Sequence, residues 1–366
     1  MTPRPVRAAV VVAPGAAFVV EDLELGAPRP DEVVVRIAAT GVCHTDLVAR
    51  GRGVGGFPGP VVLGHEGAGV VEDAGAEVTG VAPGDHVLLS FASCGACRRC
   101  RAGHPAYCEH FFALNLSGRR RDGSTALRRG SEPVGSHFIG QSSFASHAVV
   151  PASAVVKVER DLPLEVAAPL GCGLQTGAGA VLNALPVGPG SSFAVFGTGA
   201  VGLAAVMAAA VAGAGPIIGV DRHRHRLDLA AELGATRTVL VGDGEPATPP
   251  GDLAGTVDVA LDTTGAPAVL RTALDWLPPG GVLGLVASSG DEATFGYRAL
   301  LNGRTVTGII AGDAVPQEFL PRLLDLWRGG RFPFDRLVAH FPFAAVEAAA
   351  AAASAGSVIK PVLVMD

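Results

Sequence analysis

The stretch FAVFGTGAVG, residues 193–202, decides the fold, and IIGVD follows it at 217–221. The four leading apolar residues predict a short buried strand, and the alanine-rich segment after the turn predicts a helix to about Ala212. The turn has the spacing G-x-G-x-x-G, formed by Gly197, Gly199 and Gly202. A second strand ends at Asp221, 19 residues beyond Gly202. A strand, this turn, a helix and an acid at that distance indicate a dinucleotide-binding unit.

The chemistry of this unit follows from its residue types. Small residues, with Ala200 among them, let the backbone approach a pyrophosphate held at the helix N-terminus. The Asp221 carboxylate can accept hydrogen bonds from the adenosine ribose and repels a 2′-phosphate, so we predict NAD rather than NADP. Arg222 and the basic run to Arg226 weaken that preference, although a solvated helix start is the favoured interpretation of the run.

Downstream of this unit the alternation of strands and helices continues. A helix over 223–233, strands over 257–261 and 282–286, and a helix over 270–277 predict a doubly wound parallel sheet. Upstream, residues 6–40 alternate apolar and polar positions, which is typical of antiparallel β-structure.

The chain length of 366 residues favours two domains. After residue 310 the alternation stops, and helices over 317–328 and 345–353 lead to a strand over 358–364. We predict an α/β protein with a β-rich catalytic domain of residues 1–173 and 311–366, and a Rossmann cofactor domain of residues 174–310.

Composition narrows the class of protein. Charged residues are 17% of the chain, apolar residues 49%, and the net charge is −6. The charge gives no reason to expect nucleic acid or an anionic membrane as a partner. No leader precedes the first strand, so we predict a cytoplasmic enzyme. Residues 166–220 lack Asp, Glu, Lys and Arg, but prolines and glycines interrupt them, which favours a buried core over a membrane span.

A cluster of cysteines has the spacing C-x2-C-x2-C-x7-C. Its members are Cys94, Cys97, Cys100 and Cys108. Four thiolates at this spacing can surround one zinc ion and leave no coordination position open, so we predict a structural site. An iron–sulfur cluster uses the same ligands, and two disulfides are the other alternative, disfavoured in a reducing compartment.

Three separate segments carry the other candidate ligands. They are GVCHTD at 41–46, GHE at 64–66 and LGCG at 170–173. Our hypothesis is that Cys43, His65 and Cys172 hold one catalytic zinc with an open fourth position. The competing interpretations are an inert buried cysteine and a core histidine. We expect residues 41–46 to be extended, which would turn Cys43 and His44 to opposite faces.

With these motifs in place, the whole chain resembles the zinc-dependent medium-chain alcohol dehydrogenases. The segments 93–124 and FIGQSSF at 138–144 resemble the aryl-alcohol (benzyl alcohol) dehydrogenase subgroup. Terpene-alcohol dehydrogenases and thiol-dependent formaldehyde dehydrogenases are similar alternatives. The resemblance implies a GroES-like catalytic domain, a homo-oligomer (dimer or tetramer), and interconversion of a primary aromatic or allylic alcohol and its aldehyde with NAD(H), by hydride transfer from a zinc-bound alkoxide.

The resemblance also implies roles for individual residues. Glu66 would lie behind the zinc as an occasional ligand, and Thr45 would take the substrate proton. Asp46 would orient His65, or cap a helix that starts after it. The remaining implied contacts are Thr176 and Val201 to the nicotinamide, His44 and Lys360 to the pyrophosphate, and Phe138 as a wall of the substrate pocket.

One position departs from the family pattern. Val48 stands where many members have a histidine that ends a proton relay, so the proton must leave by another route, through the cofactor ribose and water. Two other classes of protein fit the sequence less well. A metal-free quinone or enoyl reductase should lack the seven metal ligands present here, and a non-catalytic NAD-binding scaffold would not need them together with Thr45.

Overall fold

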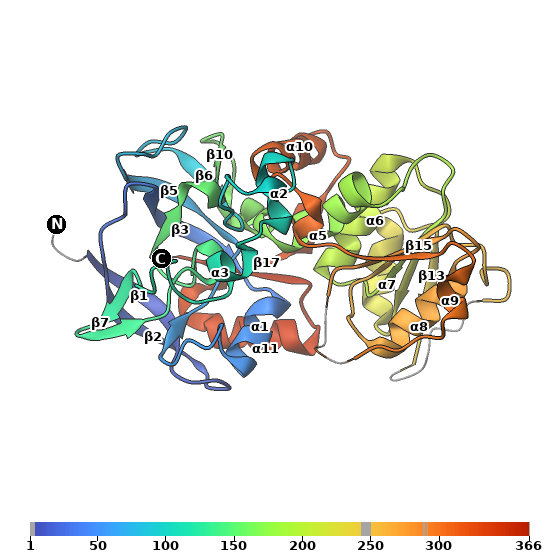
Figure 1. Ribbon diagram of the computed structural model, residues 1–366, viewed down its shortest axis with the longest axis horizontal. Coiled ribbons are helices and arrows are strands. Elements are labelled where there is room, and N and C mark those ends of the chain that lie inside the picture. Colours follow the sequence, from blue (N-terminus) through green and yellow to red (C-terminus); the bar gives the residue numbers. More distant parts are fainter. Residues whose placement is uncertain (1–3, 243–249, 288–289, 291, 366) are drawn as a thin grey trace. The chain divides into compact units, whose positions relative to one another are not determined.

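The computed structural model describes residues 4–242, 250–287, 290 and 292–365. The chain forms two compact units (Figure 1). The first unit contains the chain up to Cys172, Val315–Pro321, and the residues from Asp335 onward. The second unit contains Gly173–Ala314 and Arg322–Phe334.

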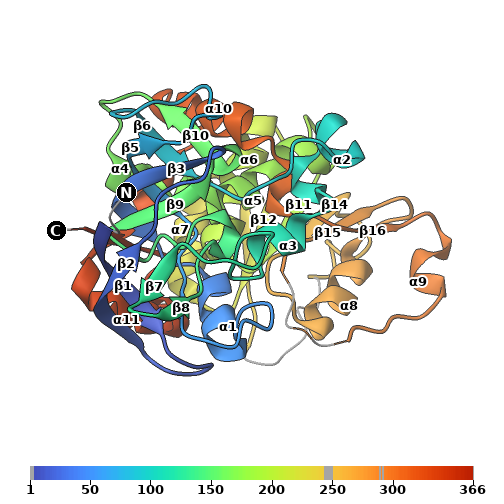
Figure 2. The ribbon, with the colours of Figure 1, turned by 60° about the vertical axis from the view of Figure 1, so that its left-hand side comes forward.

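Two sheets build most of the first unit, and all their strand pairs are antiparallel except β17 with β18. One sheet has the order β4-β1-β2-β7-β8, and its strands lie together in Figure 2. Its strands are β1 (Arg4–Val11), β2 (Phe18–Leu25), β4 (Val61–Val62), β7 (Leu127–Arg129) and β8 (Glu132–Val134). The strands β1 and β2 pair antiparallel over their whole length, as the alternating pattern predicts.

The other sheet has the order β10-β6-β5-β3-β18-β17, with β9 also paired to β3. Its strands are β3 (Glu32–Gly41), β5 (Gly67–Ala74), β6 (His86–Leu89), β9 (His147–Pro151), β10 (Val155–Val158), β17 (Val338–Pro342) and β18 (Lys360–Val364). The last strand, β18, pairs antiparallel with β3, so Val362 lies opposite Gly41. A strand from the end of the chain therefore pairs with a strand from the first 41 residues in the same sheet.

Helices α1 (His44–Arg52) and α11 (Val346–Ala355) contact each other in this unit. Its shorter helices are α2 (Arg98–Arg101), α3 (Phe111–Asn115) and α4 (Leu164–Ala167). Phe144 belongs to the core beneath them, packed edge to face on Phe18 with ring centroids 5.6 Å apart. The Phe144 amide donates to Leu63 O at 2.9 Å. Leu63 precedes His65 by two residues, so this bond joins the segment 138–144 to the segment that carries His65.

The second unit contains a parallel sheet of order β13-β12-β11-β14-β15-β16. Its strands are β11 (Phe193–Phe196), β12 (Ile217–Asp221), β13 (Arg237–Leu240), β14 (Val259–Asp262), β15 (Val282–Leu285) and β16 (Thr305–Gly308). Numbered along the chain, this is the Rossmann order 3-2-1-4-5-6, which confirms the predicted doubly wound sheet. The strand order reverses between β11 and β14, where such sheets bind dinucleotides at the carboxyl ends of the strands.

The helices of this unit follow the strands in the expected places. They are α5 (Gly173–Gly179), α6 (Ala200–Ala212), α7 (Arg224–Glu232), α8 (Pro267–Trp276) and α9 (Arg298–Leu301). Helix α6 packs on β11 and β12, and its residues 202–209 are all buried. The predicted helix end at Ala212 is confirmed, because Gly213 caps it with φ +78°.

The tail of the chain does not return to the first unit as a whole. Helix α10 (Pro316–Arg328) begins in the first unit, but residues 311–314 and 322–334 cluster with the second. Asn183 Nδ2 donates to Gly312 O at 3.2 Å, and Arg331 Nη2 donates to Val211 O at 3.4 Å. These contacts, and the buried rings of residues 332 and 334, explain why the predicted boundary at 311 differs from the compact units.

Arg120, in the loop that follows the cysteine cluster, pairs with a buried carboxylate at the start of β3. The buried Glu32 carboxylate accepts from Arg120 Nε and Nη2, each at 2.7 Å, and His137 Nε2 lies 3.3 Å away. Burial would raise the pKa of Glu32, but the hydrogen bonds from His137 and Arg120 lower it well below its usual range. The loop is thereby tied to the start of β3, which sequence analysis missed.

Within the part of the chain that the structure describes, no helix is long and apolar enough to cross a membrane.

Candidate active site

Residues 41–46 are not extended throughout, contrary to the prediction. Cys43 has extended backbone angles and caps helix α1, which begins at His44. Asp46 is the third helical residue, and its Oδ2 accepts from Cys43 N at 3.0 Å. An acid at this position commonly reaches back to the capping residue. The side chains of His44 and Thr45 are exposed on the first turn of α1.

Asp46 also contacts the GHE segment. Its Oδ1 accepts from Gly64 N at 3.0 Å and from His65 Nδ1 at 2.9 Å, and the carboxylate is fully buried. The two roles considered for Asp46, helix capping and orientation of His65, are therefore both present. A carboxylate only accepts hydrogen bonds, so Nδ1 carries a ring proton, and in the neutral imidazole that a metal binds Nε2 carries the lone pair.

His65 Nε2 is a buried nitrogen without a hydrogen-bond partner among the described residues. Ligand atoms of Cys43, His65, Glu66 and Cys172 all lie within 4.8 Å of one another. Zinc binds thiolate sulfur at about 2.3 Å and imidazole nitrogen at about 2.0 Å, so its ligands converge in this way. The donor set fits zinc, because it combines two cysteine sulfurs with the Nε2 of an imidazole that Asp46 orients.

The two cysteines of this group share one hydrogen bond. The bond from Cys172 lowers the pKa of Cys43 well below its ordinary value, against the effect of burial, and nearby Lys360 and His65 lower it further. The same bond and burial raise the pKa of Cys172. Zinc binds cysteine as the thiolate, so metal binding at this group releases the protons that its thiols hold.

Lys360 pairs with the buried Glu66. Its Nζ donates to both carboxylate oxygens of Glu66 at 2.9 Å and to Val42 O at 3.3 Å, and its side chain is buried. The ammonium neutralises the buried Glu66 carboxylate behind the cluster. The pyrophosphate contact that the resemblance implies for Lys360 stays a prediction.

Phe138 is buried beside His65, and its implied role as a wall of the substrate pocket stays a prediction. It is 1% exposed, and its ring packs edge to face on the His65 ring, with centroids 5.6 Å apart. The segment around it is strained: His137, Ile139 and Ser142 have φ of 63°, 46° and 55°. A β-branched residue such as Ile139 rarely adopts positive φ, and such outliers concentrate at functional sites. Sequence analysis assigned no role to Gln141, which is buried in the same segment.

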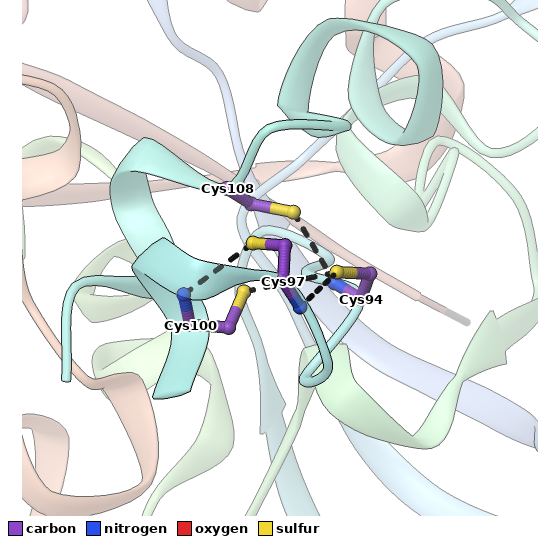
Figure 3. A group of neighbouring side chains, drawn as sticks. All are labelled: Cys94, Cys97, Cys100 and Cys108. Atoms are coloured by element: carbon purple, nitrogen blue, oxygen red, sulfur yellow. Dashed lines mark hydrogen bonds between the residues drawn. The ribbon is translucent and has the colours of Figure 1, made fainter. Parts of the chain in front are cut away.

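The four-cysteine cluster forms a separate lobe. Figure 3 shows the four sulfurs turned toward one another, and their ligand atoms lie within 4.8 Å. Backbone N–H groups donate to the sulfurs: Cys97 N to Cys94 Sγ at 3.3 Å and Cys100 N to Cys97 Sγ at 3.4 Å. Such bonds lower the pKa of Cys97 to about 6. All four thiols are free, so the arrangement fits a metal rather than two disulfides.

The glycine loop of the second unit has the backbone that its sequence predicts. Gly197 has φ +91°, and a Cβ on Gly202 would lie 1.9 Å from Gly197 O, so both positions need glycine. Asp221 ends β12, and its Oδ2 accepts from Thr198 N at 2.7 Å and Oγ1 at 3.0 Å. Asp221 thus also braces the loop, through a threonine to which sequence analysis gave no role.

The remaining predicted cofactor residues occupy the same unit or α1. Ala200 and Val201 start helix α6, after the cap Gly199. Arg222 is exposed beside Asp221, and Thr176 is buried on α5. Val48 lies on α1 three residues after Thr45, so the two are neighbours on one helix face.

Comparison with known proteins agrees with this geometry. Family models for the alcohol dehydrogenase GroES-like domain and for zinc-binding dehydrogenase match residues 29–160 and 200–327. Geraniol dehydrogenase of Castellaniella defragrans is 45% identical over 98% of this chain and 97% of that protein.

Two solved structures cover nearly all of the chain. An alcohol dehydrogenase zinc-binding domain protein from Burkholderia ambifaria is 49% identical with a TM-score of 0.93, covering 100% of both chains. Benzyl alcohol dehydrogenase from Acinetobacter calcoaceticus is 41% identical with a TM-score of 0.91, covering 99% of this chain and 100% of that one. With both cysteine groups, the oriented histidine and the Rossmann order in place, the chain belongs to the zinc-dependent medium-chain alcohol dehydrogenase family.

Proposed function

We propose that the protein interconverts a primary aromatic or allylic alcohol and its aldehyde with NAD(H), using one catalytic and one structural zinc. The observation that carries this proposal is His65 Nε2, a buried nitrogen that has no hydrogen-bond partner among the described residues, lies beside Cys43 and Cys172, and belongs to a ring that Asp46 orients. A histidine that only filled the core would have a partner for that nitrogen.

When bound at these residues, zinc supplies Lewis acidity toward the substrate oxygen. The chain's own residues then have separate tasks. Asp46 keeps the Nδ1 proton of His65 in place, so that Nε2 remains a donor. Lys360 balances the charge of Glu66 behind the cluster. A bound nicotinamide would supply the acceptor for the hydride of the alcohol, and Thr45 Oγ1 would take the substrate proton and release its own hydroxyl proton.

The proton needs a further exit. Val48 follows Thr45 on the same face of α1 and has no polar side-chain atom, so this position cannot pass the proton on. We infer that the proton leaves through the cofactor ribose and water.

Two relatives support the substrate class. Geraniol and benzyl alcohol, named for two of the matched proteins, both carry the hydroxyl on a carbon next to an sp² carbon. Oxidation of either gives a conjugated aldehyde. The similarity of the whole chain to these proteins supports the same class here, which includes allylic terpene alcohols such as geraniol; thiol adducts of formaldehyde are the competing substrates.

The cofactor preference rests on Asp221. Its carboxylate stands at the carboxyl end of β12 with His223 N donating to Oδ1 at 2.8 Å. A negative charge at that end opposes a 2′-phosphate, which supports NAD over NADP.

The test is a panel of benzyl alcohol, geraniol, ethanol, and formaldehyde with glutathione, each with NAD and with NADP. We expect the highest kcat/KM for benzyl alcohol or geraniol with NAD. A preference for formaldehyde with glutathione would move the protein to the thiol-dependent class, and no reduced cofactor with any substrate would refute the enzymatic proposal.

We also infer a homo-oligomer, either a dimer or a tetramer, in the cytoplasm. Strand β16 lies at the end of the parallel sheet, and nearby Phe295, Tyr297 and Leu301 are exposed. Exposed apolar side chains beside a sheet edge favour association. The placement of all six cysteines in two candidate metal sites supports a reducing compartment. Light scattering of the purified protein tests the oligomer, and a monomer would contradict it.

A further inference from the structure

Gln141 lies fully inside the first unit, against the turn that carries His65. Its Nε2 donates to His65 O at 2.8 Å, and its Oε1 accepts from Gly67 N at 3.0 Å. The side chain is 1% exposed. One amide therefore holds the backbone on both sides of Glu66, from His65 to Gly67.

The same amide is also connected, through Ser90, to the segment that carries Cys172. Gln141 Nε2 also donates to Ser90 O at 3.1 Å, and Ser90 Oγ donates to Gly171 O at 2.8 Å. Gly171 immediately precedes Cys172 and leaves no room for a side chain, since a Cβ there would lie 2.0 Å from Leu89 O. The segments of His65 and Cys172 are thus connected through Gln141 and Ser90.

The chemistry of this position admits few residues. A primary amide offers two donors and one carbonyl oxygen, and here both donors have carbonyl partners while the oxygen has an N–H partner. Glutamate has the same size but would place an oxygen against two carbonyl oxygens. Asparagine is shorter by one methylene.

The backbone around Gln141 adds an independent observation. His137, Ile139 and Ser142 have left-handed φ, and the Phe138 ring packs on the His65 ring. Such strain persists only where the surroundings hold it. The strained segment therefore packs directly against the catalytic cluster, through Phe138 and His65.

We propose that Gln141 is a positioning residue that fixes His65 and Cys172 relative to each other and so sets how tightly the catalytic zinc is held. This inference rests on the proposed zinc function of the cluster. Partners outside the ligand set commonly change metal affinity by about 10- to 100-fold when removed.

The test uses Gln141→Met, which keeps the side-chain volume and removes all three hydrogen bonds. The matched control is Asn115→Leu. Asn115 is also fully buried, and its amide also makes three hydrogen bonds, with Ala92 N, Ala92 O and Phe111 O, none of which lies in a segment that carries a catalytic ligand. Both variants should lose thermal stability for the same reason.

Two readouts separate positioning from stability. The first is the rate at which each metal passes to a chelator, and the second is the thiolate-to-cobalt absorption of cobalt-substituted protein. A Cys172→Ser variant, which keeps the four-cysteine site, assigns the signals. We expect Gln141→Met to release the catalytic metal about 10- to 100-fold faster and to shift its cobalt absorption. Asn115→Leu should leave both properties of that metal unchanged.

Wild-type release and an unchanged cobalt spectrum in Gln141→Met would overturn the inference. If that variant does not fold, Gln141→Glu carries the same test, with faster release expected and unchanged release as the contradicting result. Wild-type protein that binds metal only at the four cysteines would instead refute the proposed function, so the two failures are distinguishable.

Discussion

Replacing Asp46 with asparagine should loosen the catalytic metal without dismantling the fold. The carboxylate makes three contacts: Oδ2 with Cys43 N at 3.0 Å, and Oδ1 with Gly64 N at 3.0 Å and His65 Nδ1 at 2.9 Å. The asparagine oxygen keeps the two contacts of Oδ1 if its amino group takes the place of Oδ2. The opposite orientation would set two pairs of donors against each other and is disfavoured.

The magnitude follows from the one contact that is lost. The amino group then faces Cys43 N, and a buried donor without an acceptor costs about 1–3 kcal/mol. The charge that steadies the Nδ1 proton of His65 is also lost, and removing such a partner of a ligating histidine costs about 10- to 100-fold in metal affinity or activity. We expect both zinc affinity and kcat/KM to fall by that factor in Asp46→Asn.

The assay is zinc competition with a chelator together with NAD-linked alcohol oxidation, and Asp85→Asn is the control. Asp85 accepts from Ala82 N at 2.9 Å and pairs with Lys157 at 2.7 Å, outside the cluster. If Asp46→Asn keeps wild-type zinc affinity and activity, as the control should, then Asp46 does not orient His65 for a metal and the reasoning is wrong.

Three further predictions concern the rest of the chain. Glu32→Gln leaves the buried Arg120 without its charge partner and should lower the free energy of unfolding by about 3–5 kcal/mol. Because the folded pKa of Glu32 is lowered, its stabilisation is present above its unfolded pKa of about 4.3 and lost as pH falls toward the folded value, so the variant should show a weaker acid dependence in urea unfolding. An unchanged acid dependence would contradict this assignment. Cys97→Ser should reduce the metal content from two ions to one and lower the melting temperature, and elemental analysis that still finds two would rule out the four-cysteine site. Asp221→Gly should reduce the ratio of kcat/KM for NAD over NADP and also loosen the loop at Thr198, whereas an unchanged cofactor ratio would count against the ribose assignment.

Local patterns made much of the fold predictable. The strand, glycine turn, helix and acid of residues 193–221 are set by short-range rules, and the structure has them where the sequence places them. The four cysteines between 94 and 108 are close in sequence, so their spacing alone indicates a common site.

Features that depend on distant contacts were not predictable in the same way. Lys360 and Glu66 are 294 residues apart, and Arg120 and Glu32 are 88 apart, so no local pattern announces either pair. Gln141 belongs to this class, because its partners come from two distant segments, residues 65–67 and Ser90.

The prediction of an extended backbone at the start of α1 was wrong for a different reason. Cysteine is not among the favoured helix caps, so Cys43 is a weak signal for a helix start. The acid three residues later, Asp46, was the available signal, since it completes a capping pair with the Cys43 backbone.

The central claim is that Cys43, His65 and Cys172 hold a zinc ion that is distinct from the ion of the four-cysteine lobe. Anomalous X-ray diffraction from a crystal of the purified protein, measured on both sides of the zinc absorption edge, locates the metal directly. We predict two zinc peaks per chain, one touching His65 Nε2 and the sulfurs of Cys43 and Cys172, and one amid the four clustered sulfurs. A single peak in the lobe, or a signal at the iron edge instead, would contradict the account.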